Sequence, residues 1–157
     1  MSDAWLQLIP TEPEYVPAQD QIDRSLALIR GILSGDSFAA HVYDSIELIT
    51  PSENQGCIYC PGCNEKLNDE WWRQALDRAA RTGLRDRSVE TPCCEMGTTL
   101  DALKYDEAPG FARFGLEVLN PSLKVLPLLD WWGWYIEIFE PVASALDCDL
   151  KMVRQYM

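Results

Sequence analysis

The chain has 157 residues, of which 47% are hydrophobic, and its formal net charge is −12. This length is enough for one hydrophobic core with an appendage but not for two full-sized domains, and the hydrophobic content excludes an intrinsically disordered chain. We therefore expect residues 1–157 to form a single domain.

The N-terminal sequence MSDAWLQLIP lacks the basic start and the apolar run of a secretory signal. No stretch of the chain reaches the ~20 apolar residues that a membrane span requires. We therefore expect a cytoplasmic protein without a membrane segment. Because the cytoplasm is reducing, the six cysteines are expected to be metal ligands or buried thiols rather than disulfides.

The negative charge lies on both sides of the cysteine-rich middle. Residues 1–56 carry a net charge of −7, residues 57–94 are neutral, and residues 95–157 carry −5. Such a field repels nucleic-acid phosphates and attracts a basic partner. The alternative is that the acidity only keeps the protein soluble.

The N-terminal part predicts a strand, a helix and a second strand. Residues 5–9 form a short apolar run that Pro10 closes, as in an edge strand. Between residues 22 and 33, apolar residues recur with the spacing of one helix face. Residues 41–49 are rich in β-branched and aromatic side chains, which favour a strand with Val42, Ile46 and Leu48 on one side.

The neutral middle, residues 57–94, predicts an inserted zinc-knuckle arm with one helix. Asn68 is a good N-cap for that helix, and Gly83 can end it. Five arginines follow its polar faces and its end, and we expect them to be a solvated surface, with contact to a partner as the alternative. They are Arg73, Arg78, Arg81, Arg85 and Arg87.

After this arm, residues 114–119 alternate as a strand that Asn120-Pro121 stops, and a helix from residue 130 is expected to kink or split at Pro141. The last ten residues predict a final strand, on which Cys148 faces the core. The whole pattern predicts an α+β fold, in which a small sheet of the split β-α-β type carries helices on one face.

The cysteine pattern predicts a metal site. Cys60 and Cys63 form a CxxC knuckle with Pro and Gly between them, and Cys93 and Cys94 return after a helix-length excursion. Four thiolates complete the tetrahedral coordination of a structural Zn²⁺. Because adjacent residues of a strand point in opposite directions, Cys93 and Cys94 need a turned backbone to share one ion. If Cys94 points away, Cys57 is the substitute.

Two other interpretations of these cysteines stay open. The CPGC tetrapeptide is similar to redox motifs, although no other thioredoxin-like pattern surrounds it. Disulfides or inert core thiols are the third possibility.

No catalytic residue is expected. His41 is the single histidine and has no nucleophile motif near it, glycine-rich phosphate loops are missing, and pairs such as Asp106-Glu107 are better explained as loop solvation than as acid–base couples. The sequence therefore does not predict an enzyme.

A tryptophan-rich segment suggests a partner-binding surface. A helix through Trp131, Trp132 and Trp134 cannot hide every indole on one face, so some are expected at the surface, although most can pack in the core. Aromatic anchors rimmed by acidic charge are typical of a tight protein interface. The residues expected there are Trp131, Trp132, Trp134, Asp130, Asp106 and Glu107.

Residues 57–121 resemble a group of small, mostly uncharacterised bacterial proteins. The shared features are a CPxC knuckle, a later PCC, a Leu-x-x-Leu-x-Tyr stretch and the strand sequence GFARF at residues 110–114. The resemblance implies zinc at Cys60, Cys63, Cys93 and Cys94 but no established activity, and Cys57 departs from the pattern. In size and charge alone, the chain is similar to immunity proteins that block basic toxins.

The leading hypothesis from the sequence is a non-catalytic, acidic protein-binding module with a structural zinc site, of the kind that neutralises a basic bacterial toxin. The first alternative is a zinc-ribbon protein that binds nucleic acid or has a regulatory role, and it would use the five arginines. The second alternative is a CxxC redox protein.

Overall fold

The computed structural model describes residues 3–51, 56–123 and 139–156. Within them, the elements in chain order are β1 (Ala4–Pro10), α1 (Gln19–Ile32), β2 (Leu33–Ser34), β3 (Ser37–Ile49), β4 (Ile58–Tyr59), α2 (Asp69–Ala80), β5 (Ser88–Glu90), β6 (Gly97–Thr99), the 3-10 helix η1 (Leu100–Ala102), β7 (Lys104–Tyr105), β8 (Gly110–Leu119), β9 (Ser122–Leu123), α4 (Glu140–Leu146) and β10 (Leu150–Tyr156).

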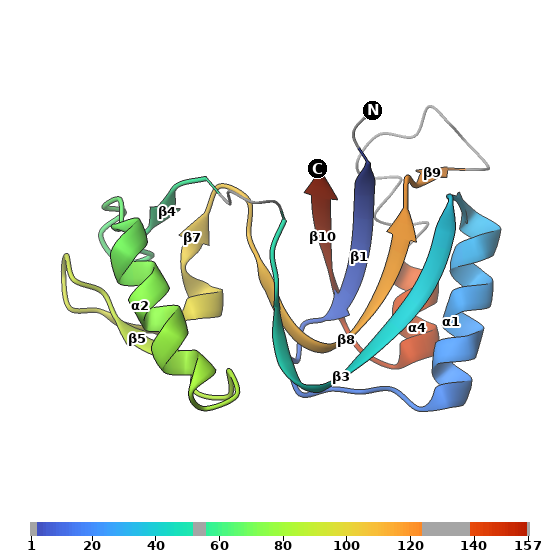
Figure 1. Ribbon diagram of the computed structural model, residues 1–157, viewed down its shortest axis with the longest axis horizontal. Coiled ribbons are helices and arrows are strands. Elements are labelled where there is room, and N and C mark those ends of the chain that lie inside the picture. The colour runs from blue at the N-terminus through green and yellow to red at the C-terminus, as the bar shows by residue number, and fades with distance from the viewer. Residues whose placement is uncertain (1–2, 52–55, 124–138, 157) are drawn as a thin grey trace.

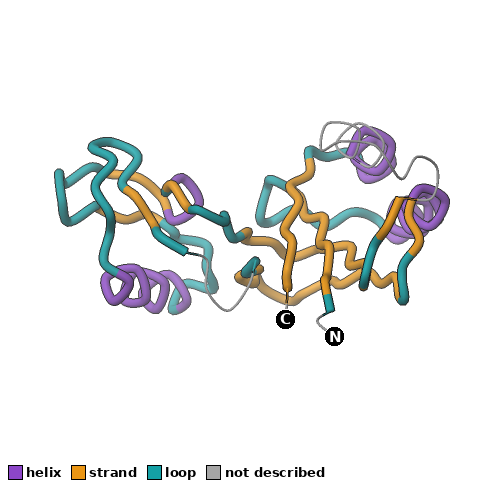
Figure 2. Tube along the Cα trace, turned by 90° about the horizontal axis from the view of Figure 1, so that it is seen from above, coloured by secondary structure: helices purple, strands orange, loops and turns teal. Residues whose placement is uncertain are grey.

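The main sheet has four strands in the order β10-β1-β8-β3, and every neighbouring pair is antiparallel. β1 and β3 are therefore parallel to each other with β8 between them, and α1 joins them along the chain. In the same way, β8 and β10 lie on either side of β1 and are parallel to each other, and α4 joins these two strands along the chain. Two split β-α-β units thus interlock, and both helices cover one face of the sheet (Figures 1 and 2). The predicted α+β class is confirmed.

The main core lies between this sheet and the two helices. Alternate residues of β1 and β8 point to the helices, whereas Ile9 of β1 and Ala112 of β8 belong to a separate small cluster, so both strands are buried along most of their length. The most buried members of this core are Leu6, Leu8, Ile29, Leu33, Phe114, Leu116, Val118, Val142 and Leu146. Cys148 packs against it, as the sequence predicts.

β1 is a central strand, so the prediction of an edge strand was wrong. It pairs with β10 on one side and with β8 on the other. Pro10 is compatible with this position because it is the last residue of the strand, opposite Leu150, where the missing N–H affects only the end of the ladder.

A large bulge interrupts β3. Val42 pairs with Phe114 and Glu47 pairs with Ala112, so four residues of β3 stand opposite a single residue of β8. A bulge bends a strand and shifts which side chains face the core. Val42 is accordingly 54% exposed, whereas Ile46 and Ile49 are buried; the expected alternation over residues 41–49 therefore fails at Val42.

Between β3 and β8 the chain forms a lateral unit, residues 58–105, that contains β4 to β7 and stands beside the main sheet (Figure 1). The side chain of Asn68 accepts hydrogen bonds from the backbone N–H groups of Glu70 and Trp71 at 2.8 and 3.3 Å, which starts α2 at the predicted place. The core of the lateral unit includes Trp72, Ala75, Ala79, Leu100 and Leu103, and it continues into Ile46 of β3 and Phe111 of β8.

The C-terminal helix agrees with the sequence in the part that the structure describes. α4 has Pro141 in its first turn, where a missing N–H costs nothing. Residues 130–138, which were expected to precede it in the same helix, lie outside the described residues. None of the described helices combines the length and the hydropathy that crossing a membrane requires.

Replacing Leu116 with alanine tests the main core. Leu116 is fully buried between the sheet and the helices, so Leu116→Ala should lower the free energy of unfolding by about 3 kcal/mol. Val42→Ala, in a neighbouring strand but 54% exposed, should change it by about 0.5 kcal/mol or less. Chemical denaturation followed by circular dichroism measures both, and equal losses would contradict the described core.

Candidate metal centre

The first cysteine pair lies in a tight turn that follows β4. The backbone N–H of Cys60 donates to the Glu65 carbonyl and the N–H of Asn64 to the Cys60 carbonyl, both at 2.9 Å. A Cβ at Gly62 would lie 2.7 Å from the Met96 sulfur, so a larger residue there would have to displace the flexible Met96 side chain. The turn therefore brings Cys60 and Cys63 to the same side.

The second pair lies in the turn that joins β5 to β6. The N–H of Thr91 donates to the Met96 carbonyl at 3.0 Å, and the N–H of Glu95 donates to the Thr91 carbonyl at 2.9 Å. Glu95 has a φ of 55°, in the left-handed region. This turned backbone lets the adjacent Cys93 and Cys94 face the first pair, which an extended strand would prevent.

The four sulfur atoms form one group. The Sγ atoms of Cys60, Cys63, Cys93 and Cys94 all lie within 4.8 Å of one another, and the Cys63–Cys93 and Cys60–Cys94 separations are 3.2 and 3.6 Å. A disulfide would need about 2.0 Å, and none of the six cysteines forms one. A tetrahedral ion with metal–sulfur bonds of about 2.3 Å has S–S edges of about 3.8 Å. The group therefore fits a metal ion.

Cys57 is not part of this group. It is half-buried, and its backbone N–H donates to the carboxylate of Asp106 at 2.9 Å. Since Cys94 faces the other three sulfurs, the set of four is complete without it.

The backbone around the knuckle favours a thiolate at Cys60. The N–H of Cys63 and the hydroxyl of Thr91 lower the pKa of Cys60 to about 6, against the effect of burial. The N–H of Glu65 lowers the pKa of Cys63, but the neighbouring thiols, first that of Cys93, together with burial, raise it to about 12. A metal that binds all four sulfurs must therefore displace protons.

Thr91 contacts two of the four cysteines, and the sequence analysis did not predict this role. Its side chain is buried, and its hydroxyl oxygen accepts from the Met96 N–H at 3.0 Å. The same oxygen lies 3.5 Å from the Cys60 sulfur and 3.6 Å from the Cys94 sulfur. A threonine two residues before a cysteine pair, able to form a side-chain turn, was the available signal.

Exposure differs among the four ligands. Cys60 is buried in the core of the lateral unit, whereas Cys63, Cys93 and Cys94 are exposed. An ion held here would join the turn after β4 to the turn after β5 close to the surface.

The other residues singled out in the sequence lie apart from the four clustered cysteines or outside the described chain. Trp131, Trp132, Trp134 and Asp130 belong to the residues that the structure does not describe. Asp106 and Glu107 are exposed. The His41 Nε2 atom lies 3.4 Å from a carboxylate oxygen of Glu117, and its ring stacks on Tyr43.

The five arginines divide into two groups. Arg87 is half-buried; its Nε donates to the Asp101 carboxylate at 3.1 Å, and its guanidinium lies 5.7 Å from the centre of the Phe111 ring. Arg87 therefore helps to pack the lateral unit. The remaining four are exposed: Arg73, Arg78, Arg81 and Arg85.

Comparisons with protein-family models, with curated proteins and with solved structures found no match for the chain. The resemblance to small bacterial proteins therefore stays a prediction.

Serine variants distinguish the fourth ligand. With cobalt as a spectroscopic probe, the wild-type protein should bind one ion and show a sulfur-to-metal charge-transfer band. Cys94→Ser should weaken that band and lower the affinity for the metal at least tenfold, because the sulfur lies within the group of four. Cys57→Ser is the matched control and should bind cobalt as the wild type does. The reverse result would place Cys57 in the site.

Proposed function

We propose that Cys60, Cys63, Cys93 and Cys94 hold one Zn²⁺ in a structural role. Four thiolates fill the four positions of a tetrahedral zinc ion and leave none for a substrate. The strands of the lateral unit are only two or three residues long, and β4–β7 and β5–β6 are separate sheets. The two cysteine-bearing turns, one beside each sheet, are thus the place where an ion would add most to the stability of this unit.

We further propose that the protein is a non-catalytic binding module that recognises a basic protein. The observation that carries this proposal is a group of carboxylates at one end of the main sheet. The loop after β1 and the loop before β10 are joined by a hydrogen bond from the Thr11 N–H to the Asp149 carbonyl at 3.0 Å. The Tyr15 hydroxyl adds a second, to the Leu146 carbonyl. These contacts hold Glu12, Asp147 and Asp149, all exposed, on neighbouring loops.

We call these three residues the acidic end. In the ion pairs formed among the described residues, none of the three takes part. Burial raises the pKa of the nearby Cys148 thiol to about 11, and the negative charges of Asp149 and Asp147 contribute to that rise. An unpaired negative field on hydrogen-bonded loops attracts and orients a positively charged surface.

A toxin-neutralising immunity protein is the class that this proposal favours. It agrees with the small size and the net charge of −12, and an acidic surface is suited to covering a basic toxin. The exposed Arg73, Arg78, Arg81 and Arg85 support nucleic-acid binding as the second candidate. Acidic residues on the same helix, such as Asp69, Glu70 and Asp77, weaken it, because they would face the same phosphates.

Removal of zinc tests the structural role. Chelation of the purified protein should lower its melting temperature and increase hydrogen exchange in the lateral unit, because metal binding is coupled to folding. The amides of β1 and of residues 114–119 of β8 should keep most of their protection, since these segments pair with each other and pack in the main core, which contains none of the four clustered cysteines. Elemental analysis should give one zinc per chain. A different stoichiometric metal, or unchanged exchange after chelation, would contradict the proposal.

Neutralising the acidic end tests the binding function. The triple variant Glu12→Gln, Asp147→Asn and Asp149→Asn keeps the size of each side chain, and Asn tolerates the left-handed φ of 57° at position 147. Capture from extracts of the source organism should give one basic protein in stoichiometric amount, and its affinity should fall at least tenfold in the variant and decrease with salt.

The control for this experiment removes the same charge elsewhere. Asp44, Glu47 and Glu65 are exposed and lie outside the acidic end, so their replacement by Asn, Gln and Gln should leave the affinity unchanged. If no stoichiometric partner is captured, or if both triple variants lose affinity equally, the proposal fails.

A further inference from the structure

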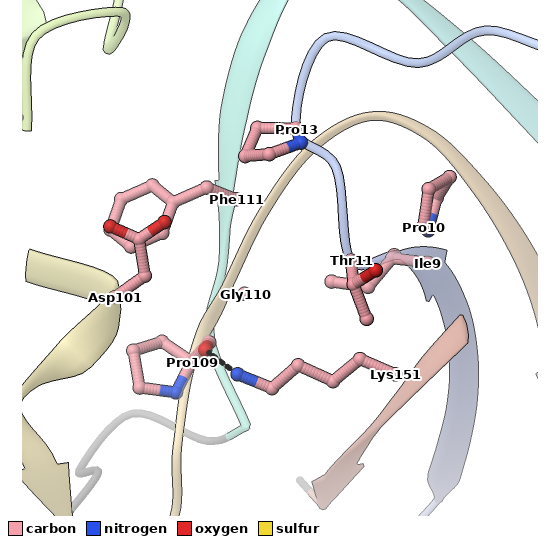
Figure 3. A pocket seen from close by; sticks show the side chains of 9 residues that line it. All are labelled: Ile9, Pro10, Thr11, Pro13, Asp101, Pro109, Gly110, Phe111 and Lys151. Atoms are coloured by element: carbon pink, nitrogen blue, oxygen red, sulfur yellow. Dashed lines mark hydrogen bonds between the residues drawn. The ribbon is translucent and has the colours of Figure 1, made fainter. Parts of the chain in front are cut away.

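A cavity of about 200 Å³ lies at the junction of the main sheet and the lateral unit (Figure 3). The end of β1, the loop after it and the start of β10 form one side, and η1 and the start of β8 form the other. The lining residues are Ile9, Pro10, Thr11, Pro13, Asp101, Pro109, Gly110, Phe111 and Lys151. Most of the wall is therefore apolar, with an ammonium and a carboxylate as its charged groups.

Lys151 is a half-buried cation in this wall. Its Nζ donates to the Pro109 carbonyl at 2.6 Å, along the side chain drawn in Figure 3. An ammonium has three donors, and the ion pairs of the described residues include none with Lys151. Burial lowers the pKa of this lysine, and the charge of Asp101 acts in the opposite direction. A cation in such surroundings is stabilised by an anionic ligand.

Asp101 supplies the opposite charge from the other side of the cavity. Its two oxygens both accept from the Arg87 Nε at 3.1 Å, which fixes the orientation of the carboxylate. A carboxylate has about four acceptor sites, and the side chain of Asp101 is 36% exposed. It can therefore accept a further hydrogen bond from a ligand.

The negative charge around the cavity determines which ligand can bind between Lys151 and Asp101. Glu12 follows Thr11 in the chain, Asp149 lies two residues before Lys151, and the chain as a whole carries −12. A ligand with a net negative charge would be repelled by this field. A zwitterion has no net charge, yet its carboxylate can bind Lys151 while its ammonium binds the side of Asp101.

We propose that this cavity binds a small free α-amino acid with an apolar side chain. Pockets for drug-sized ligands occupy roughly 300–1,000 Å³, so about 200 Å³ limits the ligand to a few carbons beyond the amino-acid backbone. The rings of Pro10, Pro13 and Phe111 face such a side chain. The proposed site is separate from the cysteines and goes beyond the proposed function.

Calorimetric titration of the full chain with L-alanine, L-valine and L-leucine tests the proposal. At least one of them should bind with a Kd of about 0.1–1 mM, as expected for a ligand of this size. N-acetyl-L-valine lacks the ammonium and L-valinamide lacks the carboxylate, so each should bind at least tenfold more weakly than L-valine. No binding at about 10 mM of any of the three amino acids, or binding of either analogue as tightly as L-valine, would overturn the proposal.

Variants place the ligand in the cavity. Lys151→Met keeps the length of the side chain but removes the charge, and it should weaken binding at least tenfold. Lys104→Met is the matched control, since Lys104 is exposed and lies on β7 outside the lining, and it should bind as the wild type does. Binding unchanged in Lys151→Met would overturn the proposal.

A measurement on the wild-type protein covers the case in which Lys151→Met does not fold. Reductive methylation followed by peptide mass spectrometry should modify Lys151 more slowly in saturating L-valine and modify Lys104 at an unchanged rate. Equal rates for Lys151 with and without L-valine would overturn the site.

Discussion

β3 and β8 pair from Ser37 opposite Leu119 to Ile49 opposite Gly110, and this ladder belongs to both cores of the molecule. Its first part lies in the main sheet under the helices. Ile46, the last residue of the bulge, and Phe111, beyond it on β8, enter the core of the lateral unit. The lateral unit is thus the loop of one long bent hairpin, and its position follows from the bend rather than from a linker.

The sheets of this lateral unit give it little stability by themselves, because they are two-stranded and their strands are short. Isolated two-stranded sheets are marginally stable in water. The lateral unit gains stability from the packing of α2 through Trp72, Ala75 and Ala79 and from the continuity with β3 and β8. The four thiols converge between the two small sheets, which share no backbone ladder, so the proposed metal ion would add a third contribution there. This explains why the thiols occur in two turns distant in sequence.

Local signals in the sequence were sufficient for some of these features. Asn68 marked the start of α2 and the CxxC spacing marked the turn of Cys60 and Cys63, because both depend on residues close in the chain; the number of cysteines that four-coordination requires pointed to the second pair. The place of β1 in the sheet was not predictable, since Pro10 is equally compatible with an edge and with the end of a central strand. The bulge after Val42 and the placement of Lys151 and Asp101 around one cavity depend on tertiary packing, which leaves no periodic pattern.

The loop after β1 and the chain around the start of β10 contribute residues both to the acidic end and to the wall of the cavity. Glu12 and Asp149 are exposed at the acidic end, while Thr11, next to Glu12, and Lys151, two residues after Asp149, line the cavity. The hydrogen bond from the Thr11 N–H to the Asp149 carbonyl joins the two loops. A ligand in the cavity that orders these two loops would also fix the positions of the carboxylates at the acidic end. Binding at either surface would then change the affinity of the other by the same factor, as linkage requires.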